Sequence, residues 1–316
     1  MPLRISRPLG LLLIALLLAT VFVPTLPGTT YWQRVLQDAG HGVVFAAVAI
    51  VLLAMQPPVP TSQRRLFRDY GRALAVAVAL GVGTEWLQVY LPARDVSLVD
   101  ALHDAVGAVL GLAIVALAER RDAATRRYAA TIALAALLVL AWEPLRCARV
   151  YAERSRSYPT LAPMGKLAYA QFVAGRNATV SHASVPAAWR RTGDGPALRL
   201  SYHPGARAAL ELTEAAPDWR NREVLALDVT NPAALPASFI LRVLDRRHDW
   251  SHQDRLNLPV IIPPGTRTTV RVSLAAIADA PAGRKMDLAA IANVMLFATR
   301  PLPGESLYVS RIWLED

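Results

Sequence analysis

The sequence predicts two domains of different fold class, an α-helical transmembrane bundle of about five spans and an all-β sandwich. Positions 9–142 contain several long apolar runs, whereas positions 150–316 have the composition of a water-soluble protein. In the second half hydrophobic residues recur at every other position, which is typical of strands with one buried side. We expect a transmembrane domain at 1–148, a linker at 149–164 and an exported β-sandwich at 165–316.

The helical domain is predicted from apolar segments, because a span normally needs about 17 to 25 predominantly apolar residues. The candidate segments are Leu9–Val23, Gly42–Met55, Arg72–Tyr90, Leu98–Ala118 and Tyr128–Trp142. The second and fifth are short on this measure, so re-entrant or interfacial placement is the alternative for both. Glu143 and Pro144 are expected to end the last span.

Arginine placement predicts the orientation in the membrane. The basic residues gather before the first segment, between the second and third, and between the fourth and fifth: Arg4, Arg7, Arg64, Arg65, Arg68, Arg72, Arg120, Arg121, Arg126 and Arg127. Loops rich in Lys and Arg stay in the cytoplasm. We therefore expect a bacterial inner (cytoplasmic) membrane protein with a cytoplasmic N-terminus. An odd number of spans places the C-terminal domain in the periplasm or outside the cell.

The composition also excludes some classes of function. The formal net charge is +10, but much of the basic excess falls in the connections just described, so membrane topology explains it better than nucleic-acid binding. Cys147 is the single cysteine, so an intrachain disulfide and a cysteine-based zinc site are both excluded.

Ionisable residues inside or beside apolar segments require an explanation, because charge in a bilayer is costly. They stand at segment ends that share one predicted side of the membrane: His41, Glu85, Gln88, Asp100, His103 and Asp104. Glu85 and Gln88 are spaced to share one helical face, and so are Asp100, His103 and Asp104. Gly107 and Gly111 continue that second face and predict close approach of another helix. These residues therefore predict a shared polar pocket.

The same residues carry a resemblance to the VanZ-like membrane family over residues 10–118. That family has an acidic residue shortly before a histidine, a Glu-x-x-Gln helix end, and a following Arg-x-x-Ser-x-x-Asp segment with two later glycines. The matching residues here are Asp38, His41, Glu85, Gln88, Arg94, Ser97, Asp100, Gly107 and Gly111. Ala39 and Asp104 depart from the family pattern, which often has lysine and asparagine there. The resemblance implies a loose link to glycopeptide response in the cell envelope.

Several kinds of chemistry fit this polar cluster. As catalytic candidates we take Glu85, Asp100, Asp104 and His41, because buried carboxylic acids and a histidine can exchange protons with a lipid or glycan head group. As ligand-binding candidates we take Gln88, Arg94, Ser97 and His103, since arginine suits phosphate oxygens.

Two other interpretations of the cluster stay open. The acids and amide can form interhelical hydrogen bonds that only stabilise the bundle, or some of these side chains can hold a divalent metal. No recognised spacing such as His-Glu-x-x-His supports a metal, so we expect neither a metal nor a cofactor. Whether the protein is an enzyme stays open.

The second half resembles jelly-roll domains of the galactose-binding or carbohydrate-binding-module type. The resemblance rests on Glu223–Pro232, Leu241–Asp245, Pro263–Gly265 and Leu307–Leu314, which mainly encode strands and turns. It implies a jelly-roll-like β-sandwich, and fold analogy alone does not imply sugar binding.

The best binding candidate in the sandwich is the polar loop from Asp245 to Arg255. Trp250 can stack on a sugar face while Asp245, Arg255 and their neighbours bond hydroxyl groups. In the alternative interpretation Asp245 pairs with Arg255, and Trp250 covers an edge of the core.

Together these features predict a membrane protein of the bacterial cell envelope. Its exported domain is expected to bind a glycan or a lipid-linked carbohydrate, with a polar site in the bundle. Its expected partners are the lipid bilayer and that glycan, and no nucleic acid. The alternative is a non-catalytic sensor or scaffold whose intramembrane polar residues are structural.

Overall fold

The computed structural model describes residues 4–22, 30–56, 63–88, 90, 98–119, 122–161, 171–203, 207–214, 216, 218–299 and 306–316. Contacts between residues divide the chain into two compact units, Met1–Ala148 and Arg149–Asp316. The boundary falls within the helix Ala123–Ser157, whose first part belongs to one unit and whose last part belongs to the other.

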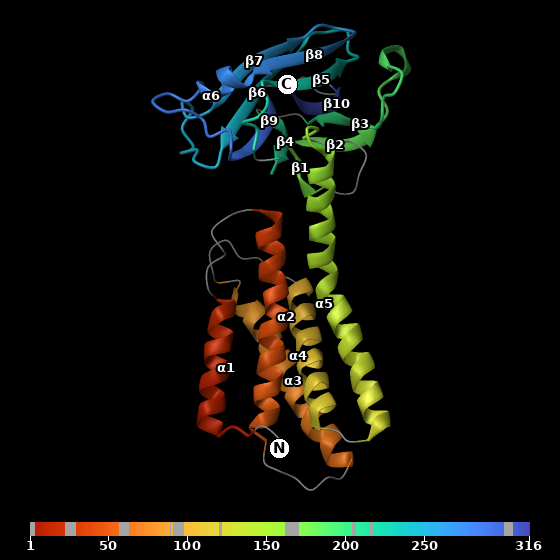
Figure 1. Cartoon of the computed structure of the whole chain (residues 1–316), viewed down its shortest axis with the longest axis vertical. Helices are drawn as coiled ribbons and strands as arrows, with labels where there is room; N and C mark the ends of the chain where they lie inside the picture. The colour runs from red at the N-terminus through yellow and green to blue at the C-terminus, as the bar shows by residue number, and fades with distance from the viewer. Residues whose placement is uncertain are drawn as a thin grey trace. The chain divides into compact units, whose positions relative to one another are not determined.

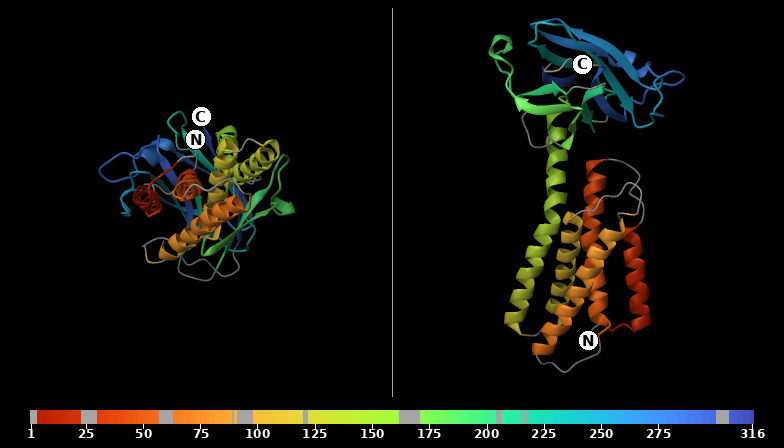
Figure 2. Two further views of the ribbon diagram at one scale, coloured as in Figure 1. Left: turned by 90° about the horizontal axis from the view of Figure 1, so that it is seen from below. Right: turned by 180° about the vertical axis from the view of Figure 1, so that it is seen from behind.

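The first unit is helical. Its elements are α1 Arg7–Val21, α2 Tyr31–Ala54, α3 Gln63–Gln88, α4 Leu98–Glu119 and the first part of α5 Ala123–Ser157 (Figure 1). The helix α2 packs against α1, α3 and α4, and α3 also packs against α4 (Figure 2). Ile5 donates its backbone N–H to Ala54 O at 3.2 Å, so the start of α1 lies beside the end of α2.

The expectation of about five spans is corrected by the helix lengths and compositions. Within the described residues, three helices are long and apolar enough to cross a membrane: α2, α4 and α5. The helix α1 has only 15 residues. In α3 the apolar stretch is limited by Arg72 at its start and by Glu85 and Gln88 at its end.

Two predicted helix boundaries are also wrong. Thr30 caps α2, because its hydroxyl accepts the Gln33 N–H while Gln33 Oε1 accepts the Thr30 N–H at 3.2 Å. His41 therefore lies well inside α2 rather than opening the span. Pro144 does not end α5, which continues to Ser157, so residues 149–157 of the predicted linker are helical. Arg146 and Glu143 form an ion pair across the proline at 3.2 Å.

The predicted close approach at Gly107 and Gly111 is confirmed. A Cβ atom on Gly107 would lie 2.1 Å from the backbone oxygen of Gly42, and one on Gly111 would lie 2.3 Å from that of Ala46. The α4 backbone therefore touches the α2 backbone over one helical turn. Two glycines on one face permit this contact, because any larger residue would separate the helices.

The second unit contains two antiparallel five-stranded sheets. In spatial order, the first has β1 Val173–Arg176, β4 Arg207–Thr213, β9 Ile291–Thr299, β6 Ala237–Asp245 and β7 Leu256–Ile262. The second has β2 Ala178–Ala183, β3 Ala197–Tyr202, β10 Ser306–Glu315, β5 Val224–Asn231 and β8 Thr266–Ser273. A short 3-10 helix, Ala187–Trp189, and α6, Leu274–Ala278, lie between strands.

A hydrophobic core between the two sheets explains the sandwich. Leu200, Leu227, Leu241 and Leu296 from four different strands are all fully buried. Along β6 buried and more exposed residues alternate strictly, as the period of two predicts. The predicted β-sandwich is therefore confirmed.

Replacing Gly107 by alanine tests the helix contact. The new methyl group cannot fit beside Gly42 O without moving α4, so Gly107→Ala should lower bundle stability by about 1–3 kcal/mol, the usual cost of overpacking. Gly83→Ala is the control, because a Cβ atom there meets nothing within 4 Å. Thermal unfolding of both variants in detergent checks this, and equal midpoints would contradict the contact.

Candidate functional site

The bundle brings three of the predicted site residues together. His41 comes from α2, Glu85 from α3 and Asp104 from α4, with exposed fractions of 4%, 3% and 1%. His41 Nδ1 lies 3.2 Å from Asp104 Oδ1 and 4.0 Å from Glu85 Oε1. One ligand atom from each residue lies within 4.8 Å of the others. We call these residues the bundle triad.

Other predicted residues surround the triad less closely or fall outside the described chain. Gln88 and His103 are buried, and neither Gln88 Nε2 nor His103 Nδ1 has a hydrogen-bond partner among the described residues. Asp100 is half-buried in the first turn of α4. Arg94 and Ser97 lie outside the described residues.

Glycine also explains how the third helix reaches the triad. A Cβ atom on Gly81 would lie 2.9 Å from Asp104 Oδ2, so α3 approaches α4 at this point. Glu85 follows one helical turn later on the same face of α3. The triad therefore forms where α3 and α4 approach closely. This point lies within about one helical turn of the contact between Gly42 on α2 and Gly107 on α4.

The second candidate site is the loop after β6. Asp245 is 1% exposed and accepts hydrogen bonds from Arg284 Nη1 at 2.6 Å and Nη2 at 2.9 Å. It also accepts the backbone N–H of Asp287 at 2.7 Å. Asp245 therefore pairs with Arg284, so the pairing with Arg255 that the alternative interpretation gave is wrong. Arg255 is half-buried, and its Nε has no partner among the described residues.

Arg284 binds a second carboxylate as well. Its Nη2 donates to Asp254 Oδ2 at 2.8 Å, and the same oxygen accepts the Asp249 N–H at 2.9 Å. The bonded guanidinium holds the pKa of Asp254 well below its usual range. The two carboxylates in turn raise the pKa of Arg284. This ion network joins both ends of the loop to the segment around Arg284.

Trp250 stands at the tip of this loop. Its side chain is 83% exposed, so it does not cover a core edge. Its backbone has φ of +67°, a conformation that bulky residues rarely adopt. The His248 ring lies 5.6 Å from the Trp250 ring, with the two planes inclined at 58°.

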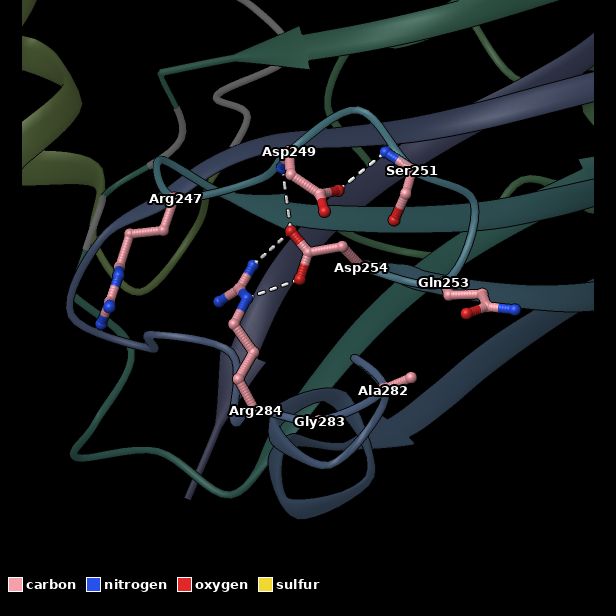
Figure 3. A pocket seen from close by; sticks show the side chains of 8 residues that line it. All are labelled: Arg247, Asp249, Ser251, Gln253, Asp254, Ala282, Gly283 and Arg284. Carbon is pink, nitrogen blue, oxygen red and sulfur yellow. Dashed lines mark hydrogen bonds and ion pairs between the residues drawn. The ribbon is translucent and has the colours of Figure 1, made fainter.

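A polar pocket of about 400 Å³ opens beside the same loop. Figure 3 shows its lining residues, Arg247, Asp249, Ser251, Gln253, Asp254, Ala282, Gly283 and Arg284. The side chains of Asp254 and Arg284 point toward each other and are hydrogen-bonded (Figure 3). The predicted loop 245–255 contains five of these eight residues, but the sequence analysis did not include Ala282, Gly283 and Arg284, which come from a distant segment.

A further arginine and aromatic pair lies on the first sheet and was also missed. The Arg242 guanidinium stacks 4.8 Å above the Phe297 ring, and Arg242 Nε donates to Asn257 Oδ1 at 2.9 Å. Arg242 and Phe297 belong to the neighbouring strands β6 and β9. The alternation of buried and exposed residues within each strand indicates that Arg242 and Phe297 are partly exposed. Only the register between β6 and β9 shows that they are neighbours.

Two groups among the described residues offer three metal-ligating side chains. One is the bundle triad, and the other is His248, Asp249 and Asp254. In the second group Asp254 is bonded to Arg284, and His248 Nδ1 lies 2.8 Å from Asp254 O. Because the Arg284 guanidinium already neutralises the Asp254 carboxylate, the second group is the poorer metal site.

The solved structures reported below each match less than half of this chain. No family model and no curated protein matches the chain. An exo-β-agarase structure is 16% identical with a TM-score of 0.37, covering 45% of this chain and 22% of that one. The chain thus spans about a fifth of the agarase's length.

Carbohydrate-binding modules of Clostridium thermocellum are also similar. A family 11 module in complex with a β-1,3-1,4-mixed-linked tetrasaccharide is 13% identical, with a TM-score of 0.35 and coverage of 45% and 86%. A family 30 module of a cellulosomal cellulase is 12% identical, with a TM-score of 0.32 and coverage of 45% and 93%. Likeness at this level establishes no family, and the VanZ-like resemblance stays a prediction.

Removing the Arg284 side-chain charge should destabilise the sandwich. Arg284→Met leaves the buried Asp245 carboxylate unpaired, which typically costs about 3 kcal/mol or more of the free energy of unfolding. Arg271→Met is the matched control, because its partner Glu315 is on the surface and exposed pairs contribute little. Denaturant unfolding of the full-length protein, followed by tryptophan fluorescence, compares them. A similar loss in both variants would contradict the role assigned to Arg284.

Proposed function

We propose that the chain is a membrane protein of the bacterial cell envelope whose β-sandwich binds a glycan or a lipid-linked carbohydrate. The observation that carries this proposal is the exposed Trp250, whose two neighbours in the chain, Asp249 and Ser251, line a polar pocket. Both lie on a loop that the Arg284 ion network braces. The similarity to carbohydrate-binding modules is compatible with this function and is not its basis.

The physical argument starts from the cost of the Trp250 conformation. A large apolar ring exposed to water gains no burial energy, and a bulky residue at positive φ is strained by about 1–3 kcal/mol. Such a conformation persists only where the surroundings impose it, and it is concentrated at binding sites. The flat ring can cover the apolar face of a sugar.

The pocket supplies the groups that a sugar's hydroxyls need. Arg247 and Gln253 offer N–H donors, and Asp249 offers carboxylate oxygens. Converging polar groups beside an aromatic surface are the usual composition of a small-molecule site. Since Asp254 and Arg284 are already bonded to each other, they position the loop rather than bind the ligand.

The bundle supports a placement in the inner membrane, with a cytoplasmic N-terminus and an exported sandwich. The start of α1 lies beside the end of α2, and Gln56 Nε2 donates to Asp69 O near the start of α3 at 2.9 Å. The helix α4 runs parallel to α2, because residues 42 and 46 meet residues 107 and 111 in order. The end of α4, and with it the start of α5, therefore lies at this same end of the bundle.

This end carries the described arginines of the predicted cytoplasmic connections, namely Arg4, Arg7, Arg68, Arg72, Arg126 and Arg127. A cluster of arginines at one end favours the cytoplasmic side. The helix α5 begins there and is long and apolar enough to cross. Its C-terminal end, and the sandwich after it, would then be exported. The VanZ-like resemblance of residues 10–118 agrees with an envelope location.

Reporter fusions test this orientation. Alkaline phosphatase fused after Asp316 should be active, because that enzyme requires export, whereas a fusion after Arg127 should be inactive. Green fluorescent protein at the same two positions should give the opposite pattern. An Asp316 fusion that is fluorescent and lacks phosphatase activity would overturn the proposed orientation.

Glycan binding is tested with the full-length protein in detergent. A glycan array that includes peptidoglycan fragments and lipid-linked oligosaccharides should identify a ligand, and Trp250→Ala should weaken its binding about tenfold, or about 1.4 kcal/mol. Trp250→Phe retains an aromatic face and should lose less. Ile261→Ala is the control, because Ile261 is an exposed apolar residue on β7, 68% exposed and away from the loop.

The outcome that overturns the proposal is equally specific. If no envelope glycan on the array binds, or if Trp250→Ala binds as tightly as the unchanged protein, the loop is not the site. Arg242→Ala included in the same series would then show whether the sheet surface with Phe297 binds the ligand instead.

A further inference from the structure

We propose that the bundle triad of His41, Glu85 and Asp104 is a binding site for a divalent transition-metal ion. The inference is independent of glycan binding by the sandwich. It rests on the contacts within the bundle, on the burial of the three side chains and on the balance of their charges.

The first argument is geometric. Around a tetrahedral metal with bonds of about 2.0–2.2 Å, neighbouring ligand atoms lie about 3.4 Å apart. His41 Nδ1 and Asp104 Oδ1 are 3.2 Å apart, which is already close to that separation. Glu85 Oε1 is 4.0 Å from the same nitrogen, so a small side-chain rotation brings it to the required separation.

The second argument is electrostatic. Two carboxylates and an imidazole lie together at exposed fractions of 4% or less, where an unbalanced charge is costly. A divalent cation bound to two carboxylates and a neutral imidazole makes a site with no net charge.

An unpartnered atom points to a ligand in the same place. Asp104 is 1% exposed, yet its Oδ2 has no hydrogen-bond partner among the described residues. Buried carboxylate oxygens are nearly always bonded, so this atom requires a partner. A metal bound through both oxygens of the Asp104 carboxylate would satisfy it.

The surrounding backbone makes the site rigid. Gly42, next to His41, contacts Gly107 on α4, and Gly81, one turn before Glu85, contacts Asp104. Each ligand is therefore carried by a helix whose position is set within one turn of the site. Metal sites on rigid elements hold their ligands in the required geometry better than sites on loops.

The ligand types indicate the kind of ion. One imidazole nitrogen and two carboxylate oxygens suit Zn²⁺ or Mn²⁺, whereas Ca²⁺ prefers six to eight oxygen ligands. Three protein ligands leave coordination positions for water or another group. Because His41, Glu85 and Asp104 lie on three helices, no local sequence motif reveals this site.

Metal binding by the purified protein tests the proposal directly. The full-length protein in detergent is treated with chelator, dialysed against Zn²⁺ or Mn²⁺ at fixed free concentrations, and measured by elemental mass spectrometry. We expect about one bound ion per chain, with affinity at least tenfold weaker in Glu85→Gln and Asp104→Asn. Both substitutions keep side-chain size and remove one negative charge.

Controls separate this site from other acidic and histidine residues. Glu143→Gln removes an acid elsewhere in the helical unit, and His248→Ala removes the histidine of the second group. Both should bind the metal as the unchanged protein does. Circular dichroism of each metal-free variant verifies that the helices are retained.

Thermal unfolding provides a second readout. A metal that binds the folded bundle should raise the melting temperature of the unchanged protein but not that of Asp104→Asn. The proposal is overturned if the unchanged protein binds no ion, or if Glu85→Gln and Asp104→Asn bind it with unchanged affinity. Neither result would affect glycan binding through Trp250.

Discussion

The contact between the α2 and α4 backbones at Gly42 and Gly107 is the constraint on which the helical site depends. Without a side chain at Gly107, the two helices approach closely enough for His41 to reach Asp104. Gly81 permits a similar approach of α3, which brings Glu85 to the same place. Small residues thus determine the position of the charged ones, because the absence of side chains at these glycines lets the helices approach closely.

In the β-sandwich, an ion network rather than a glycine contact holds the candidate site in place. Asp245 is buried at the end of β6, and its charge would be costly without Arg284. Since Arg284 also bonds Asp254, the same interaction closes the loop that carries Trp250. The strained, exposed ring is therefore supported by a buried charge pair. The proposed binding residue, Trp250, and the Arg284 ion network that supports its loop are therefore different residues.

The two candidate sites differ in how charge is balanced. In the sandwich every carboxylate of the network has an arginine or backbone donor, so its charge is balanced within the protein. In the bundle two carboxylates lie within 4.0 Å of His41, and Oδ2 of the buried Asp104 has no hydrogen-bond partner among the described residues. This contrast is the physical reason why we propose a metal ion as the ligand of the bundle and a neutral glycan as the ligand of the loop.

The sequence by itself determined the two fold classes, the glycine contact face and the identity of the clustered residues His41, Glu85 and Asp104. Composition and periodicity report these features, because they depend on neighbours along one element. Only the tertiary structure decided that α5 continues past Pro144, that Arg284 pairs with Asp245, and that the three bundle residues meet. Those outcomes depend on which faces pack together, and periodicity within one element carries no information about its partner.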